Sequence, residues 1–206
     1  MAALGAFLMA PRPSVAAPLR IVALGDSLTA GYGLPGDQAF PARLQKALRA
    51  KGYDVKIVNA GVSGDTTTAG LDRLAWSVPE GTDGVILELG ANDALRGVDP
   101  KITKATLENI LDALAKHHIP VLLAGMQSPR NMGPDYVKRF DAIYPALAAH
   151  YDVVFYPFFL AGVAANPKLN QADGMHPNPQ GVDIIVQRML PSVEQLIARA
   201  KQARGS

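Results

Sequence analysis

The stretch Ile21-Val22-Ala23-Leu24-Gly25-Asp26-Ser27-Leu28-Thr29-Ala30-Gly31-Tyr32-Gly33 passes from an apolar run into a polar, glycine-rich segment. The apolar run is typical of a buried strand that ends at Gly25. Glycines after it let the backbone turn sharply and approach a ligand. Ligands bind at the carboxyl ends of the strands in open α/β sheets. Ser27 is therefore a candidate functional residue, although Gly-Asp-Ser is also a common turn sequence.

Length and composition limit the classes of protein to consider. With 206 residues, the chain is long enough for one domain with a sizeable core and too short to predict two. Apolar residues make up 49% and charged residues 18%, which is typical of a globular protein. The net charge is +2 and there is no basic run, so we expect no nucleic-acid partner. The chain has no cysteine and no apolar run long enough for an integral membrane segment. The oligomeric state stays open.

Residues 1–18 are predicted to be the remnant of a signal peptide or a disordered tail. Residues 1–10 are apolar, and Ser14-Val15-Ala16 before Ala17 resembles a small-residue cleavage site. No positive side chain precedes Arg12, so the basic region of a complete signal is missing. We expect a periplasmic or secreted protein, with a cytoplasmic location as the alternative, and a single domain over residues 19–206.

Predicted strands and helices alternate along this domain. Strands are expected over 20–24, 55–60, 84–89, 120–124 and 152–155, and helices over 39–51, 67–76, 102–118, 134–149 and 181–203. Such alternation implies a parallel sheet with helices on both faces. Right-handed crossovers favour a flavodoxin-like order of five strands, so the expected fold is a three-layer α/β/α sandwich. The predicted connections are short, so no lid is expected.

Polar residues and glycines follow four of these strands, all at one edge of the predicted sheet. Ser27, Gly64 and Asn92 follow the first three strands, and Asp173 and His176 follow the fifth. A serine becomes a nucleophile only when a base takes its proton, so His176 is the candidate base and Asp173 its orienting carboxylate. The N–H groups of Ser27 and Gly64 and the Asn92 amide are candidate donors for an oxyanion hole.

Four sequence blocks together resemble those of the GDSL-type (SGNH) serine hydrolases: Gly25-Asp26-Ser27-Leu28, Ser63-Gly64-Asp65, Gly90-Ala91-Asn92-Asp93 and Asp173-Gly174-Met175-His176-Pro177. The resemblance runs from about Arg20 to the C-terminal helix. It is greatest to the bacterial branch of multifunctional thioesterases, lysophospholipases and arylesterases. It implies that Ser27 is the nucleophile, His176 the general base and then acid, and Asp173 its partner. It also implies an oxyanion hole of Ser27, Gly64 and Asn92, with Gly61 as a less well matched alternative to Gly64.

The function implied by this resemblance is the hydrolysis of short- to medium-chain acyl esters through an acyl-serine intermediate, without a cofactor. Aryl esters, acyl thioesters and lysophospholipids are the expected small-molecule substrates, and a carbohydrate acetylesterase with the same residues is the alternative. A nucleotide-binding module would need G-x-G-x-x-G or G-K-[ST], which the first loop lacks. A catalytically inactive binding protein on the same fold is disfavoured, because all five site residues are present.

Apolar side chains near the candidate loops are expected to line an acyl site. The residues proposed for it are Leu28, Tyr32, Leu95, Met126 and Met175, with Leu34, Met132 and Phe158 as further candidates.

The remaining polar candidates have structural interpretations. Asp26, Asp65 and Asp93 are expected to brace their loops through hydrogen bonds to backbone amides. His117, His118 and His150 lie at predicted helix ends and receive no function. No histidine or carboxylate cluster has the spacing of metal ligands, so no metal is expected.

Overall fold

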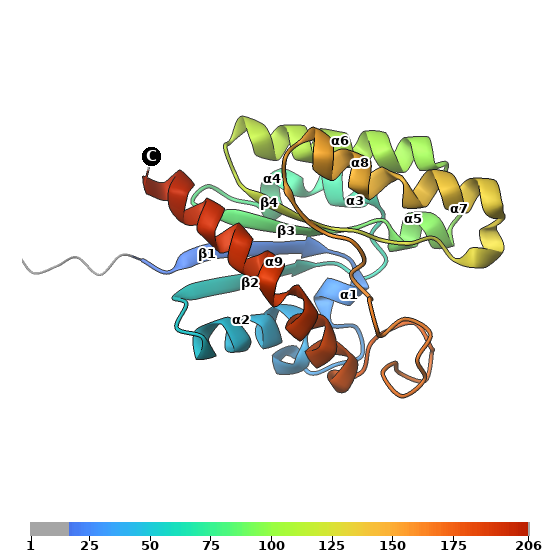
Figure 1. The fold of residues 1–206 in the computed structure, drawn as a ribbon, viewed down its shortest axis with the longest axis horizontal. Coiled ribbons are helices and arrows are strands. Elements are labelled where there is room, and N and C mark those ends of the chain that lie inside the picture. Colours follow the sequence, from blue (N-terminus) through green and yellow to red (C-terminus); the bar gives the residue numbers. More distant parts are fainter. Residues whose placement is uncertain (1–16, 206) are drawn as a thin grey trace, which may run out of the picture.

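Five parallel strands form one sheet in the order β2-β1-β3-β4-β5 (Figure 1). The computed structural model describes residues 17–205, so the predicted signal segment lies outside the described residues except for Ala17 and Pro18. This order is the flavodoxin-like one expected from the sequence. The strands are β1 (Leu19–Gly25), β2 (Val55–Gly61), β3 (Gly84–Glu88), β4 (Val121–Ala124) and β5 (Val154–Tyr156).

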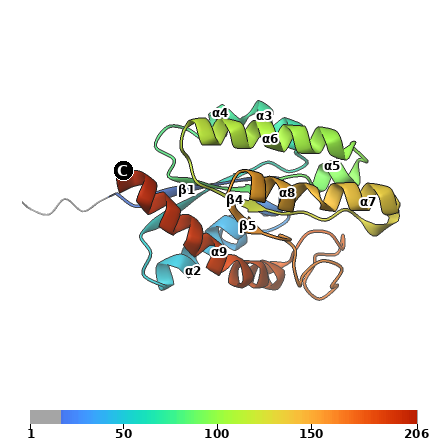
Figure 2. The same cartoon turned by 45° about the horizontal axis from the view of Figure 1, so that its top comes forward.

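Helices cover both faces of the sheet (Figures 1 and 2). One face carries α2 (Phe40–Ala50) and α9 (Pro179–Gly205), and the other carries α3 (Thr67–Asp72), α4 (Leu74–Ser77), α6 (Pro100–Lys116) and α8 (Ile143–His150). Shorter elements lie at the carboxyl edge of the sheet: α1 (Ser27–Ala30), α5 (Ala91–Leu95), α7 (Pro134–Asp141) and the 3-10 turns η1 (Gly36–Gln38) and η2 (Arg130–Met132).

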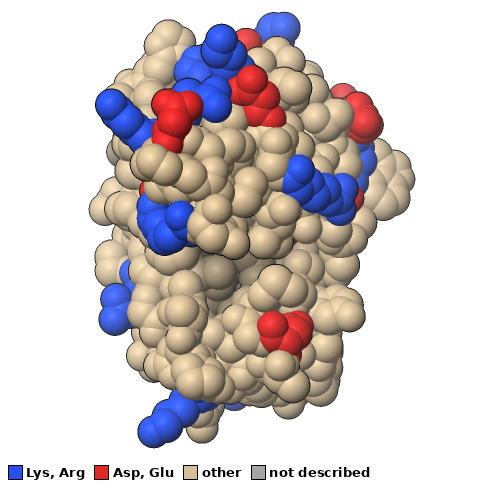
Figure 3. All heavy atoms as spheres, turned by 90° about the vertical axis from the view of Figure 1, so that its right-hand side faces the viewer, with Lys and Arg blue, Asp and Glu red and all other residues tan. Residues whose placement is uncertain are grey.

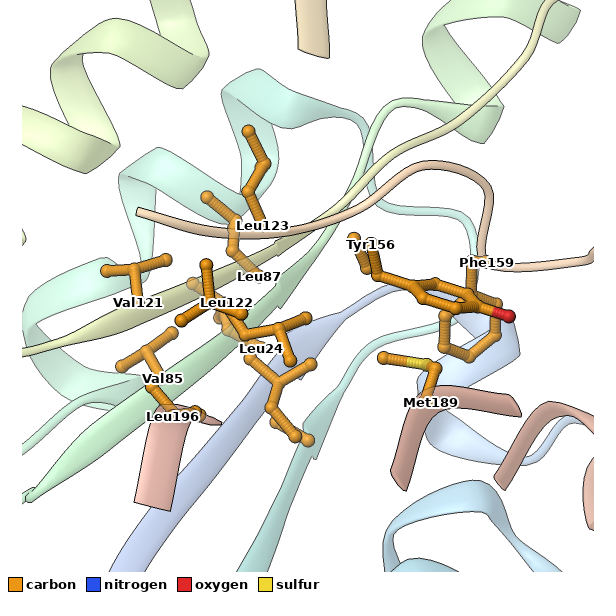
Figure 4. Close-up of a cluster of buried hydrophobic side chains, with 14 of the residues drawn as sticks. Leu24, Val85, Leu87, Val121, Leu122, Leu123, Tyr156, Phe159, Met189 and Leu196 are labelled. Atoms are coloured by element: carbon orange, nitrogen blue, oxygen red, sulfur yellow. The ribbon is translucent and has the colours of Figure 1, made fainter. Parts of the chain in front are cut away.

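The central strands are buried on both faces, which explains their nearly continuous apolar sequences. All residues of β3 and β4 are buried. Figure 4 shows Leu196 and Met189 of α9 pointing toward the side chains of the sheet. Burying one such leucine or methionine contributes roughly 1.5–3 kcal/mol. The core therefore fixes the strands whose carboxyl ends carry the candidate site residues.

Two predicted helices are each divided in the structure. The helix predicted over 67–76 breaks at Arg73, and the one over 134–149 breaks at Ala142. At the first break, the Arg73 guanidinium donates hydrogen bonds to the carbonyl oxygens of Gly25 and Ala60 and pairs with Asp65 at 2.6 Å. These bonds connect the ends of β1 and β2 to Arg73, so tertiary contacts are made at the residue where the predicted helix breaks.

The prediction that all connections are short was wrong for the one between β5 and α9. Residues 157–178 contain no helix or strand apart from an isolated bridge between Asn170 and Pro177. The segment satisfies its own polar groups instead. The Asn170 amide donates to the carbonyl oxygens of Val163 and Asn166, both at 2.9 Å. The sequence of this segment has neither helical nor strand periodicity, so it gave no measure of this internal order.

Candidate active site

Ser27 is the first residue of the short helix α1, not part of an irregular loop as its sequence suggested. Asp26 caps this helix by accepting a hydrogen bond from Leu28 N at 2.9 Å. The helix ends at Gly31, whose φ of 82° is a left-handed conformation that favours glycine. There is also no space for a side chain at this position, because a Cβ at Gly31 would lie only 2.4 Å from Ala39 Cβ. The capping carboxylate and the glycine together fix the half-buried Ser27 at the end of β1.

Ser27, His176 and Asp173 form a continuous hydrogen-bonded chain. His176 Nε2 lies 3.0 Å from Ser27 Oγ, and His176 Nδ1 lies 2.6 Å from Asp173 Oδ2. Asp173 Oδ1 also accepts hydrogen bonds from the backbone N–H groups of Met175 and His176. The backbone and ring N–H groups of His176, with the N–H of Met175, lower the pKa of Asp173 to about 2. The carboxylate is therefore ionised at neutral pH and can hold the imidazole with Nδ1 protonated.

The three donors predicted for an oxyanion hole differ in their hydrogen bonds. Among residues 17–205, no acceptor takes a hydrogen bond from the N–H of Ser27 or of Gly64. Gly64 has a φ of 88°, and its carbonyl accepts from Arg96 Nη2 at 2.8 Å. The Asn92 amide donates to Asp26 Oδ2 at 3.0 Å and to Asp65 O at 2.9 Å. Asn92 is thus tied to the segments that carry Ser27 and Gly64.

Two buried carboxyl groups lie beneath this arrangement. Burial raises the pKa of Asp26 to about 6, against the lowering effect of the hydrogen bond from Leu28 N. Burial also raises the pKa of Glu88, at the end of β3, well above its usual range, and the Asp26 charge raises it further. Glu88 Oε2 accepts from Thr29 Oγ1 at 2.7 Å and Asp26 N at 3.4 Å, whereas Oε1 has no partner among the described residues. The sequence analysis did not single out Glu88, although it is the only charged residue in the predicted strand 84–89.

The expected hydrogen bonds to backbone amides are confirmed for Asp26 and Asp93, whereas Asp65 pairs with a side chain. Asp26 caps α1, and Asp65 pairs with Arg73. Asp93 is fully buried and accepts hydrogen bonds from Thr67 N, Thr67 Oγ1 and Thr103 Oγ1. The loops at the carboxyl edge are therefore connected through carboxylates.

An apolar cleft of about 470 Å³ opens beside Ser27 and His176. Figure 3 looks onto the edge at the carboxyl ends of the strands, where the hollow is bordered mainly by uncharged side chains. Five predicted acyl-site residues line it, namely Leu28, Leu95, Met126, Phe158 and Met175. Three others do not: Tyr32, Leu34 and Met132. The Tyr32 ring instead lies against the His176 ring, with centroids 4.6 Å apart.

Part of the lining was not predicted. It comes from the segments after β4 and β5: Gln127, Ser128, Pro129, Arg130, Leu160, Ala164 and Ala165. Both segments leave the same carboxyl edge as Ser27, so the topology rule that located the other residues could have identified them. Arg130 at the rim is paired with Asp141 at 2.6 Å and donates to Gln127 Oε1.

Among residues 17–205, no three His, Asp or Glu side chains come close enough to hold a metal ion. No helix of the same range is long and apolar enough to cross a membrane.

Comparison with known proteins decides the family. The model of the GDSL-like lipase/acylhydrolase family matches residues 23–184, which include the segments of Ser27, Gly64, Asn92, Asp173 and His176. The chain belongs to this family. The match covers the end of β1 and all of β2 to β5, so the expected family is confirmed.

Individual members of the GDSL family are similar over most of the chain. An arylesterase of Vibrio mimicus is 40% identical over 78% of this chain and 81% of its own. The thioesterase 1/protease 1/lysophospholipase L1 of Escherichia coli (strain K12) is 38% identical over 86% of this chain and 84% of its own. A crystal structure of TesA superposes with a TM-score of 0.81 and 38% identity, covering 86% of this chain and 99% of that one. The three-layer fold is therefore that of solved family members.

Proposed function

We propose that this GDSL-family protein hydrolyses short- to medium-chain acyl esters and thioesters through an acyl-serine intermediate. The observation that carries the proposal is the chain Ser27 Oγ–His176 Nε2–Asp173 at the mouth of an apolar cleft. A nucleophile hydrogen-bonded to a base, itself oriented by a carboxylate, is the arrangement that acyl transfer requires.

In the first half of the proposed reaction, His176 Nε2 takes the Ser27 Oγ–H proton while Oγ bonds to the substrate carbonyl carbon. The carbonyl electron pair moves onto oxygen, and the proposed donors that stabilise it are the N–H groups of Ser27 and Gly64 and the Asn92 amide. The intermediate then collapses, and the bond from carbon to the leaving oxygen or sulfur breaks. The leaving group receives its proton from His176, and the acyl group stays on Ser27.

In the second half, His176 takes a proton from water, and the water oxygen bonds to the acyl carbon. Collapse of this second intermediate breaks the bond to Oγ, and His176 returns the proton to Ser27. Asp173, which its hydrogen bonds keep ionised at neutral pH, stabilises the imidazolium in both halves. Every proton transfer uses side chains of this chain, and no metal or cofactor is needed.

The cleft supports an acyl chain over a carbohydrate as the bound group. Its wall consists mainly of leucine, methionine, phenylalanine, alanine and proline side chains, and Met126 at its base is buried. Burying each methylene of an acyl chain there contributes up to about 0.8 kcal/mol. The names of the relatives, arylesterase and thioesterase/lysophospholipase, agree with this substrate class.

A fluorophosphonate probe tests the proposal, because it reacts with a serine only where a base activates it. We expect the wild-type protein to be labelled at Ser27 and to hydrolyse p-nitrophenyl butyrate and butyryl thioesters. Ser27→Ala should lose both properties while retaining its unfolding temperature, since the side chain is small and half-buried. Near-native hydrolysis by Ser27→Ala, or labelling at another residue, would contradict the assignment.

Export to the periplasm, or secretion, is a separate proposal that rests on the apolar residues 1–10 and the small residues before Ala17. Expression of the full chain followed by N-terminal sequencing of the periplasmic fraction tests it. Cleavage after Ala16 is expected. An uncut protein in the cytoplasmic fraction would contradict it.

A further inference from the structure

Gln171 connects the segment that carries Ser27 to the segment that carries His176. Its Nε2 donates to Tyr32 O at 2.7 Å and to Pro177 O at 3.0 Å. Tyr32 lies just beyond α1, and Pro177 directly follows His176. The amide of Gln171 therefore donates to one carbonyl oxygen in the segment of Ser27 and to one in the segment of His176.

Few other polar contacts join these segments. Among the described residues, hydrogen bonds between 26–34 and 157–178 are limited to the one from Gln171 to Tyr32 and the one between His176 and Ser27. Residues 172–175, directly before His176, are exposed and gain little from core packing, whereas Pro177 directly after it is buried. Gln171 N donates to His176 O at 2.7 Å, and Asn178 accepts from the N–H groups of Gly181 and Val182 in α9. These bonds set the shape of the segment and connect it to α9, but they do not reach α1.

The backbone near Tyr32 is shaped to receive this side chain. A Cβ at Gly33 would lie 2.2 Å from Gln171 Oε1, so any larger residue would displace the amide. Gly33 also has a φ of 72°, which side chains other than glycine rarely adopt. The close approach fixes the direction of the amide and aims Nε2 at Tyr32 O.

We propose that Gln171 is a positioning residue that sets the distance between Ser27 Oγ and His176 Nε2. This inference rests on the proposed function, because it concerns activation of the same serine. Without the amide, the internally bonded segment of His176 shifts as a unit relative to α1. Proton transfer depends steeply on geometry, and a displacement of about 1 Å can cost on the order of 10²-fold in rate.

Variants at position 171 separate hydrogen bonding from packing. Gln171→Met has nearly the same shape but no donor, and Gln171→Lys keeps donors that can reach both carbonyl oxygens. Gln180→Met is the matched control, because Gln180 is exposed at the start of α9. For each variant, kcat and KM for p-nitrophenyl butyrate, the rate of fluorophosphonate labelling and the unfolding temperature would be measured.

We expect Gln171→Met to lower kcat and the labelling rate by about 10- to 100-fold, with KM changed less than about twofold. Gln171→Lys should recover most of that loss, and Gln180→Met should behave as wild type. A residue that served stability alone would lower the unfolding temperature without slowing the labelling of folded protein. The proposal is overturned if Gln171→Met labels as fast as Gln180→Met, if its defect lies in KM, or if Gln171→Lys is no better than Gln171→Met. If the probe did not label Ser27 in the wild-type protein, the proposed function itself would be contradicted.

Discussion

The Asn92 amide donates one N–H to Asp26 Oδ2 at 3.0 Å, so a side chain after β3 is bonded to the residue that directly precedes Ser27. Its second N–H donates to Asp65 O at 2.9 Å. Both amide hydrogens are therefore engaged in the ligand-free site. To stabilise an oxyanion, Asn92 has to exchange or share one of these bonds. Its contribution then appears only when negative charge develops on the substrate oxygen.

Asn92→Ala should lower kcat by roughly 10²–10³-fold with little change in KM, because the lost donor acts mainly on the transition state. Steady-state kinetics with p-nitrophenyl butyrate measure both constants. Thermal unfolding serves as a control for the lost bonds to Asp26 and Asp65. A normal kcat with a much larger KM would make Asn92 a residue that binds the ground-state substrate.

Asp173→Asn should lower kcat by about 10³–10⁴-fold, as the loss of an orienting carboxylate does in other serine hydrolases. An asparagine amide facing His176 Nδ1 favours the tautomer whose Nε2 is protonated, and that nitrogen cannot accept the Ser27 proton. The kcat of the variant is compared with that of Asp37→Asn, which alters an exposed carboxylate in η1. Equal activities of the two variants would rule out this role for Asp173.

The same Asp173 substitution has a pH-dependent effect on stability. The pKa of Asp173 falls from 3.8 to about 2 on folding, so its ionised form stabilises the protein above pH 3.8. This contribution is lost as the pH falls through about 2. Asp173→Asn should thus be less stable than wild type at pH 6 and approach it near pH 2. Urea unfolding at both pH values measures this, and a stability gap that widens on acidification would contradict it.

Glu88→Gln should make the free energy of unfolding less dependent on pH. Burial raises the pKa of Glu88 above the 4.5 of the unfolded chain, so its stabilising contribution is present below pH 4.5. That contribution is lost as the pH rises through the folded value. Glutamine cannot ionise, yet its Oε1 can still accept from Thr29 Oγ1 and Asp26 N. Urea unfolding at pH 5 and pH 9 is the measurement, with Glu80→Gln on the surface as the control. Equal pH dependence in Glu88→Gln and Glu80→Gln would show that Glu88 is ionised in the folded protein.

The rate of aryl ester hydrolysis should rise with acyl length and then level off. Each methylene buried in the 470 Å³ cleft contributes up to about 0.8 kcal/mol, whereas methylenes beyond its end stay in water. The segment 157–178 contributes part of the lining, has an internally bonded shape and is connected to Tyr32 by Gln171, so no jump in rate is expected at a lipid interface. A series of p-nitrophenyl esters from acetate to palmitate, followed by a triglyceride emulsion, measures this. A rate that climbs to the longest chains and jumps at the interface would indicate a lipase with a moving lid.

The sequence by itself determined the strand order and the positions of the five candidate residues. Apolar runs such as 21–24 and 85–87 are buried on both faces, and handed crossovers leave few orders for five parallel strands. Residues that follow parallel strands share one edge, so Ser27, Asn92 and His176 were expected together before any distance was known.

Only the tertiary structure decided how these residues are held. The bond from the Asn92 amide to Asp26, the pKa of about 6 of this carboxyl and the bond from Gln171 to Tyr32 depend on partners far away in the chain. Hydrogen bonds and burial depend on distances of a few ångströms, and a one-dimensional pattern carries no such distances. Tyr32 illustrates this. From its sequence position close to Ser27, it was expected to line the acyl site. In the structure it instead packs against His176.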